Sequence, residues 1–351
     1  MRSAVPTVTA LIMCLAASAQ AQTLGPEFIG SYTILDLGTV DGVDPNYGGL
    51  VFDELDPNVL LLSGRANAQT AEIYALSVSR DKAGHVIGLS CEPPAFFSTA
   101  PGASGGIDGG LDFGPSGVLF YSTYSDNHIG QILPGSTAPD RLIDLSPLGI
   151  AASTGTLRFV PPGFAGAGRL KIASYNSGRW YDTAVAPAGD GTFDIQVSRG
   201  FVQLTGGPEG IVYIAGGNPG FANDSILLSR YQAGAVSAYE IDRNGDPIPE
   251  TARVFISGLG GVEGAAIDPV TGDFFFSTFG GGNRVIRVSG FLAEAGCRSD
   301  LNGDGTVDGA DLGDLLSAWD NPGGLGDLSG NCIVDGQDLG ILLAEWGDCP
   351  Q

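Results

Sequence analysis

The sequence has few of the basic and nucleophilic side chains on which many catalytic sites depend. Lys82 and Lys171 are its only lysines, and His85 and His128 are its only histidines. It has 16 basic residues against 39 acidic ones, which gives a formal net charge of −23. Neither an H-E-x-x-H nor a C-x-x-C motif occurs. Two histidines exclude a histidine-rich catalytic metal centre, and so acidic a surface repels nucleic acid and anionic membranes.

Long hydrophobic runs are absent beyond the first residues. Residues 1–21 have the pattern of an export signal, with a positive start at Met1-Arg2, an apolar run and a small-x-small cleavage site that ends at Ala21. The run is too short to span a bilayer, and no later run of 18 or more follows. We therefore expect a secreted protein, extracellular, at the cell surface or periplasmic, that begins near Gln22. Export permits disulfides among Cys91, Cys297, Cys332 and Cys349.

One unit occurs twice near the end of the chain, at 300–319 and 327–346, with paired positions offset by 27 residues. Each copy is an Asp- and Gly-rich loop followed by L-G-x-L-L-x-x-W. In each copy the apolar residues recur every three or four residues, as on one face of a helix. We expect these two faces to pack on each other, and they comprise Leu312, Leu315, Leu316, Trp319, Leu339, Leu342, Leu343 and Trp346.

Both loops have the spacing of oxygen ligands that Ca²⁺ requires. In the first loop the expected ligands are Asp300, Asn302, Asp304, Thr306, Asp308 and Asp311, with Gly305 at the sharp turn. In the second they are Asp327, Ser329, Asn331, Ile333, Asp335 and Asp338. Cys332 replaces the turn glycine there, and Asn331 removes one carboxylate, so weaker binding is expected. A turn rich in Asp and Gly that binds nothing is the alternative.

This tandem pattern resembles the dockerin type I module, and the resemblance covers about the last 55 residues. It implies a calcium-organised helical module, here 296–351, that docks a cohesin-like protein. Gly309, Ala310, Gly336 and Gln337 stand where dockerins often carry hydroxyl residues for that docking. Since the ends of such modules lie close together, the resemblance implies a Cys297–Cys349 disulfide. Cys332–Cys349 is the competitor, and Cys91 and Cys332 are the expected free thiols.

The remaining residues, 22–295, predict one mainly β domain. A glycine opens each of five repeated groups of short apolar runs, at Gly49, Gly110, Gly155, Gly210 and Gly264. Their spacing is close to that of propeller blades. The last group lacks a fourth run, and Ser31–Gly38 supplies one that would close the ring. We therefore predict a β-propeller of five blades, or six if the long first interval hides one. A β-sandwich is the alternative.

The run from Gly261 to Val288 also resembles exported propellers of the NHL and gluconolactonase type. That resemblance implies a funnel with a divalent metal held by Glu, Asn and Asp. Glu209 and Glu263 precede equivalent strands, and we considered as further funnel candidates the loop residues Asn127, His128, Asn176, Arg179, Asn283 and Arg284. Local turn formation explains the asparagines equally well. His85 is expected in an exposed hairpin turn. Sugar stacking or core packing would account for Tyr124, Tyr175, Trp180 and Tyr181.

Two functions follow from these patterns. The first is a secreted, calcium-binding, non-catalytic recognition propeller that is displayed through its dockerin-like module and takes a carbohydrate ligand in polysaccharide use. The second is a propeller enzyme, a lactonase, hydrolase or lyase on sugar-derived substrates, with the same tether. The missing catalytic motifs favour the first, without excluding the second.

Overall fold

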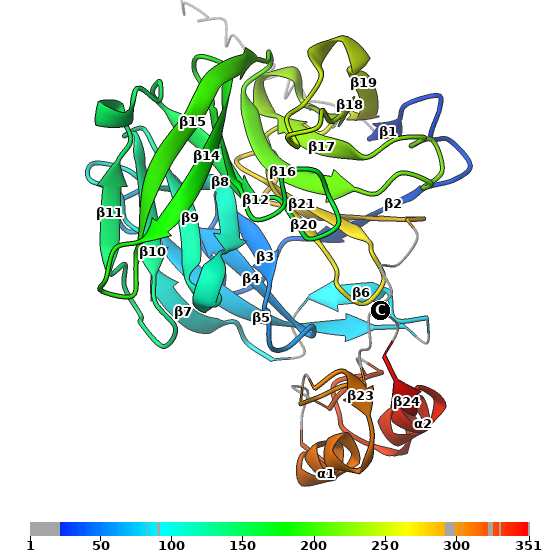
Figure 1. The fold of residues 1–351 in the computed structure, drawn as a ribbon. Coiled ribbons are helices and arrows are strands. Elements are labelled where there is room, and N and C mark those ends of the chain that lie inside the picture. Colours follow the sequence, from blue (N-terminus) through cyan, green and yellow to red (C-terminus); the bar gives the residue numbers. More distant parts are fainter. Residues whose placement is uncertain are drawn as a thin grey trace, which may run out of the picture.

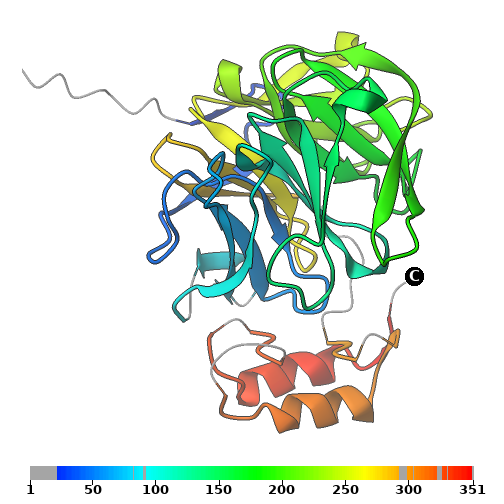
Figure 2. The same ribbon diagram turned by 90° about the vertical axis from the view of Figure 1, so that its left-hand side faces the viewer.

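The computed structural model of the protein describes residues 22–81, 83–89, 92–291, 299–302, 304–321, 326–329 and 331–349. The predicted export signal lies outside them. A ring of β-sheets makes up most of the molecule, and a small helical module lies against one of its faces (Figures 1 and 2). Within these residues no helix has the length and hydropathy to cross a membrane.

The ring is a five-bladed β-propeller, as the glycine-led repeats predict. Each blade is an antiparallel sheet whose strands follow one another in order from the ring axis outward. Blade 1 comprises β3 (Leu50–Phe52), β4 (Val59–Gly64), β5 (Glu72–Arg80), β6 (Val86–Leu89) and β7 (Ala95–Thr99). Blade 2 comprises β8 (Gly106–Phe113), β9 (Leu119–Tyr124), β10 (His128–Ile132) and β11 (Arg141–Asp144). Blade 3 comprises β12 (Thr154–Phe159), β13 (Leu170–Ser174), β14 (Arg179–Pro187) and β15 (Phe193–Gln203).

The last two blades both take strands from the N-terminal segment. Blade 4 comprises β16 (Pro208–Ile214), β17 (Ser225–Arg230), β18 (Ala235–Glu240) and β19 (Arg253–Ser257), with β1 (Thr23–Leu24) beside β19. Blade 5 comprises β20 (Val262–Ile267), β21 (Phe274–Thr278), β22 (Val285–Ser289) and, as its outer strand, β2 (Thr33–Gly38). Thr33 pairs with Ser289 and Asp36 with Ile286. The predicted closure of the ring by the N-terminal strand is confirmed.

The long first interval holds a divided outer strand rather than a sixth blade. β6 pairs with the Val78–Arg80 end of β5, and β7 pairs with its Glu72–Ala75 end. Two short strands therefore share the outer edge of blade 1. The six-bladed and sandwich alternatives are both wrong.

The repeated glycines are needed because the inner strands meet closely around the axis. A Cβ added at Gly210 would lie 2.4 Å from the backbone nitrogen of Ala265, in the next blade. The same holds for Gly264, whose added Cβ would lie 2.7 Å from the carbonyl oxygen of Gly48. Apolar side chains fill the spaces between neighbouring blades, such as Phe120 and Ile172 between blades 2 and 3. The glycine signal in the sequence thus reflects the packing of the ring.

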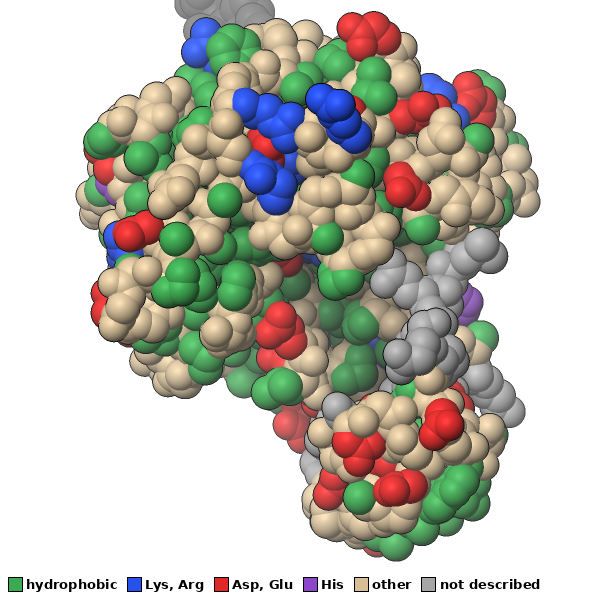
Figure 3. Space-filling view, viewed as in Figure 1, with side chains coloured by type: hydrophobic (Ala, Val, Ile, Leu, Met, Phe, Trp, Pro, Cys, Tyr) green, Lys and Arg blue, Asp and Glu red, His purple; other side chains and the backbone are tan. Residues whose placement is uncertain are grey.

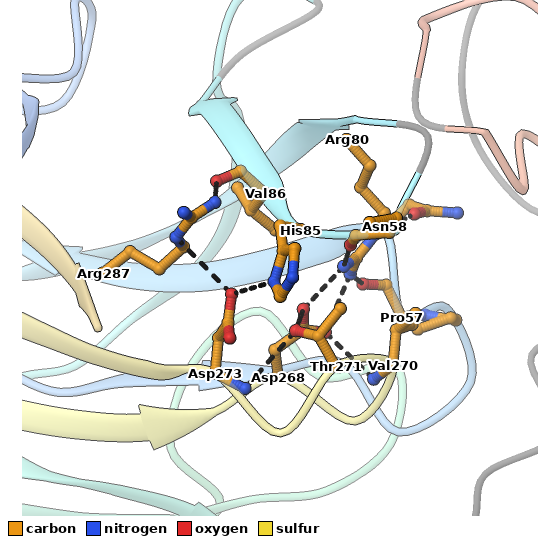
Figure 4. Close-up of polar contacts among 12 residues, drawn as sticks. Pro57, Asn58, Arg80, His85, Val86, Asp268, Val270, Thr271, Asp273 and Arg287 are labelled. Atoms are coloured by element: carbon orange, nitrogen blue, oxygen red, sulfur yellow. Dashed lines mark hydrogen bonds and ion pairs between the residues drawn. The ribbon is translucent and has the colours of Figure 1, made fainter. Parts of the chain in front are cut away.

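A buried polar network joins blade 1 to blade 5 where the ring closes (Figure 4). Arg80 donates to both carboxylate oxygens of Asp268, at 2.6 and 3.0 Å. Nδ1 of His85 lies 2.7 Å from Asp273 Oδ2. His85 does lie in the hairpin turn between β5 and β6, as predicted, but its ring contacts blade 5 and is only partly exposed. These contacts fix the first blade against the last.

The C-terminal module contains two nine-residue helices, α1 (Gly309–Ser317) and α2 (Gly336–Ala344). A two-stranded ladder of β23 (Thr306–Val307) and β24 (Gly347–Asp348) joins its ends. Its small core comprises Val307, Leu315, Leu328, Val334 and Leu342. Asn58 of the propeller donates from Nδ2 to the carbonyl oxygen of Asp327 at 2.9 Å, and this bond connects the two parts.

Only part of each predicted apolar helix face packs inside this module. Leu315 and Leu342 are buried, whereas Leu316, Trp319, Leu343 and Trp346 are 37–53% exposed. α1 ends at Ser317 and α2 at Ala344, so both tryptophans lie beyond their helices. The expectation that the complete faces pack on each other is therefore wrong. Hydrophobic side chains are visible on the outer end of the module in Figure 3.

Candidate functional site: an acidic funnel on the propeller axis

Three acidic residues project from inner strands toward the axis of the propeller. Asp108 lies in β8, Glu209 in β16 and Glu263 in β20. Each stands where its strand shifts register against the next strand, between Ile107 and Leu111, Pro208 and Ile211, or Val262 and Ala265. Such bulges redirect side chains out of the sheet pattern. Three different blades therefore deliver carboxylates to one point.

The three carboxylates form a compact buried cluster. Their nearest oxygens all lie within 4.8 Å of one another, and each residue is 2% exposed. Asp108 Oδ2, Glu209 Oε2 and Glu263 Oε2 are buried without a hydrogen-bond partner, and so is Asn67 Oδ1 nearby. Buried polar atoms are nearly always paired, so four unpaired oxygens in one place indicate a site for a ligand.

The environment of the cluster opposes ionisation of all three groups. Burial raises the pKa of Asp108 to about 7. Burial, together with the charge of Asp108, raises the pKa of Glu209 well above its usual value. Burial and the charges of Glu209 and Asp108 do the same for Glu263. Three like charges at this separation repel strongly. The cluster must therefore bind protons or a cation.

Four aromatic side chains surround the opening above the cluster. Tyr124 ends β9, and Tyr175, Tyr231 and Phe279 each directly follow the second strand of their blade. Neighbouring rings contact each other at large angles: Tyr124–Tyr175 at 5.7 Å and 86°, Tyr175–Tyr231 at 5.8 Å and 76°, and Tyr231–Phe279 at 6.4 Å and 63°. The funnel encloses about 300 Å³, and Asn67 of blade 1 completes its lining.

The structure brings together Glu209 and Glu263 but places the other predicted funnel residues elsewhere. Asn127 binds the carbonyl of Ile150, Asn176 donates to Ser153, and Asn283 accepts from the backbone of Asn46. His128 lies beside Asp126, Arg179 stacks over Phe201, and Arg284 pairs with Asp36. These loop residues are not among those that line the funnel, because their polar groups satisfy neighbouring backbone and side chains.

The four aromatic residues singled out in the sequence divide between two roles. Tyr124 and Tyr175 line the funnel. Trp180 and Tyr181 are 1% and 3% exposed and belong to the cores between blades. Tyr124 and Tyr175 therefore lie where they could stack against a sugar, whereas Trp180 and Tyr181 are explained by core packing.

The segment Gly102–Gly106 has the spacing G-x-S-x-G of a hydrolase nucleophile turn but not its structure. That motif needs a sharp strand-to-helix turn. Here the segment leads into β8, and the backbone N–H of Ser104 donates to Asp126. It therefore does not form a nucleophile turn.

The two C-terminal loops adopt the same backbone hydrogen bonds. Asp300 accepts from the N–H groups of Asp304 and Gly305, and Asp327 accepts from those of Asn331 and Cys332. Asp311 and Asp338 each accept from the helix N-cap residue of their own loop, Asp308 or Asp335. Cys332 has φ 71° where Gly305 has φ 91°. The two copies of the sequence repeat thus share these loop hydrogen bonds.

The cysteines fall partly outside the described residues. Cys332 and Cys349 are each disulfide-bonded, so the expectation of a free thiol at Cys332 is wrong. Cys91 and Cys297 belong to the residues that the structure does not describe. The predicted Cys297–Cys349 pairing stays a prediction.

The funnel contains four residues that sequence reasoning missed: Asn67, Asp108, Tyr231 and Phe279. Glu209 and Glu263 each directly precede a repeat glycine. Asp108 is followed by two glycines, and this additional residue moves it out of register. A search for any acid within two residues of the repeat glycines would have found it. An aromatic residue at or just after the end of the second strand in blades 2 to 5 is the corresponding signal for Tyr231 and Phe279.

Comparison with known proteins assigns no family to this chain. No family model and no curated protein matches it. A solved streptogramin B lyase matches at 10% identity, over 74% of this chain and 97% of its own, with a TM-score of 0.38. An auxiliary nutrient binding protein from Bacteroides ovatus matches at 10% identity over 74% and 76%, with a TM-score of 0.41. A glucose dehydrogenase-type putative oxidoreductase from Thermus thermophilus matches at 14% identity over 73% and 99%, with a TM-score of 0.40. Matches this distant leave the ligand open.

Proposed function

We propose that this protein is an exported recognition protein whose propeller holds a divalent cation in its funnel and presents it to a small, oxygen-rich ligand such as a carbohydrate. The observation that carries the proposal is the set of unpaired, buried oxygens of Asp108, Glu209 and Glu263. Buried carboxylates without cationic partners are costly, and a bound cation removes that cost.

The donor set fits a hard cation. Oxygens within 4.8 Å of one another leave a point at most about 2.8 Å from all three. Ca²⁺ binds carboxylate and amide oxygens at about 2.3–2.6 Å in flexible geometry, so a small inward movement of the side chains completes the fit. Asn67 Oδ1 supplies a neutral fourth oxygen. Water molecules or hydroxyl groups of a ligand would fill the remaining coordination positions of the cation, on the side of the aromatic opening.

The C-terminal module serves in this proposal as a calcium-organised tether of the dockerin type. Its support is the matching set of hydrogen bonds in the two loops, with Asp311 and Asp338 both fully buried. The half-exposed Leu316, Trp319, Leu343 and Trp346 are available to contact a cohesin-like partner. The missing hydroxyl residues at 309–310 and 336–337 leave the identity of that partner to experiment.

The test is calcium stoichiometry by calorimetry on the full chain. Glu209→Gln with Glu263→Gln should abolish the funnel site and leave the C-terminal sites. Asp300→Ala with Asp311→Ala should instead remove the site of the first C-terminal loop and leave the funnel site. Glu250→Gln, an exposed carboxylate, is the matched control. An unchanged stoichiometry in the funnel variant, with the fold intact by circular dichroism, would refute the cation centre.

A catalytic role is the second candidate. The observation that favours it is the close approach of Asp108 and Glu263: their interaction adds to the burial that raises the pKa of Glu263 and partly offsets the burial that raises the pKa of Asp108. A carboxyl pair that shares a proton beside a metal can act as a general acid and base. Hydrolysis of sugar lactones that depends on Glu263 would support this role, and its absence would favour pure recognition.

A further inference from the structure

The charge of the funnel selects among the ligands that its size admits. Three of the eight residues that line it are acidic, and none is Lys, Arg or His. One divalent cation neutralises two of three carboxylate charges, so a fully ionised cluster retains one negative charge. An anionic ligand would meet this charge in a site of low dielectric constant without any basic partner.

The aromatic opening favours a cation as well. Tyr124, Tyr175, Tyr231 and Phe279 come from four successive blades, and each ring is set at a large angle to the next. The four rings line one space, the box, so a ligand that enters it can lie against their π faces. A cationic group against such faces is attracted by the ring quadrupole, as in the aromatic cages that bind quaternary ammonium groups.

The field of the carboxylates reaches these rings. Burial raises the pKa of Tyr231, and the charge of Glu263 raises it further. Burial does the same for Tyr175, with a contribution from Glu209. The charges of the cluster therefore act on these two rings.

We propose that the funnel selects small ligands that carry a positively charged amino group, amino sugars among carbohydrates, and excludes anionic ones such as uronates. The amino group lies inside the box of Tyr124, Tyr175, Tyr231 and Phe279, above the carboxylate cluster. The inference deepens the proposed function, because it names the ligand class of the same site. It rests on the unpaired buried carboxylates and the ring geometry.

The experiment compares ligands of the same ring size and different charge. Calorimetry on the calcium-loaded full chain at about pH 6.5, where such an amine carries its proton, would use glucosamine, N-acetylglucosamine and glucuronate, with tetramethylammonium as the minimal cation. Glucosamine should bind at least about tenfold more tightly than N-acetylglucosamine. Glucuronate should not bind, and tetramethylammonium should compete with glucosamine.

Substitutions in the box test its contribution to ligand binding independently of the cation centre. Tyr231→Leu with Phe279→Leu should weaken glucosamine and tetramethylammonium about tenfold and leave calcium stoichiometry unchanged. Phe201→Leu, an exposed ring under Arg179, is the matched control. Equal affinity for the neutral and cationic sugars, or no binding of either, would overturn the inference while leaving the calcium centre standing. Loss of the calcium centre with glucosamine binding retained would instead overturn the proposed function alone.

Discussion

At the scale of single residues, the funnel depends on balanced charge. Glu263 lies within 4.8 Å of both Asp108 and Glu209, and none of the described residues that line this space is cationic. Glu263→Gln keeps the shape and removes one charge. In chelator it should raise the melting temperature, because it relieves repulsion. In calcium the same substitution should lower the melting temperature, because it removes a metal ligand. Thermal unfolding in the two buffers checks this reversal, and a shift of one sign in both would contradict it.

Asp182 lies away from the funnel and makes a pH-dependent contribution to the stability of the folded protein. Burial favours its neutral form, but hydrogen bonds from Arg169, Lys171 and Arg199 outweigh this and hold the pKa below its usual value. Its contribution is therefore present above the unfolded pKa of about 3.9 and is lost as pH falls through the folded value.

Asp182→Asn should accordingly destabilise the protein at neutral pH by about 3 kcal/mol, the scale expected when a buried charge loses its partner. Lys171 retains Asp246 as a second partner, so the fold should survive. Denaturant unfolding should show the difference from the wild type shrinking as pH falls below about 4. A difference that is constant across this range would contradict the argument.

Single residues also show where sequence reasoning stops. Glu209 and Glu263 could be placed because each precedes a repeat glycine, whereas Asp108 was hidden by one additional residue. Asn127 and Asn176 were considered for the funnel because side-chain type and loop position match a ligand. Their hydrogen bonds to neighbouring segments depend on tertiary contacts that no local pattern encodes.

At the scale of elements, the inner strands require glycine. A Cβ at Gly210 would lie 2.4 Å from the backbone of Ala265, whereas one at Gly200 would meet nothing within 4 Å. Gly210→Ala should therefore cost about 1–3 kcal/mol, while Gly200→Ala should be nearly neutral. Denaturant unfolding of the two variants checks this. Equal stabilities would show that the inner strands can move apart.

The N-terminal strands test the closure of the ring. β2 completes blade 5, and Phe28 and Tyr32 belong to the core between blades 4 and 5. Deleting residues 22–38 should expose the edge of β22, cause aggregation and lower the melting temperature sharply. Melting like that of the intact chain would contradict a closed ring.

Most elements could be predicted because repeat glycines and apolar runs mark them locally. The division of the outer edge of blade 1 between β6 and β7 could not, because both strands pair with one long β5. The partial exposure of the C-terminal helix faces could not be predicted from the sequence either. Helical spacing identifies a shared face, but the short helices α1 and α2 end before Trp319 and Trp346.

At the scale of the whole molecule, calcium removal should affect the two parts differently. The C-terminal module has a small core, and its loops concentrate carboxylates that repel one another without metal. In chelator its two tryptophans should lose their ordered environment, while the large cores between blades keep the propeller folded. Tryptophan fluorescence in a Trp180→Phe background checks the module, and far-ultraviolet circular dichroism checks the strands. Identical spectra in calcium and chelator would contradict this view.

The pairing of β2 with β22 also imposes an order on folding in time. Thr33 cannot pair with Ser289 until nearly the whole propeller has been synthesised, so β2 has no partner strand before then. Contacts this distant in sequence slow folding and leave strand edges open in the meantime. Until the beginning of the chain returns to its last blade, the outer edge of β22 is open to association with other chains.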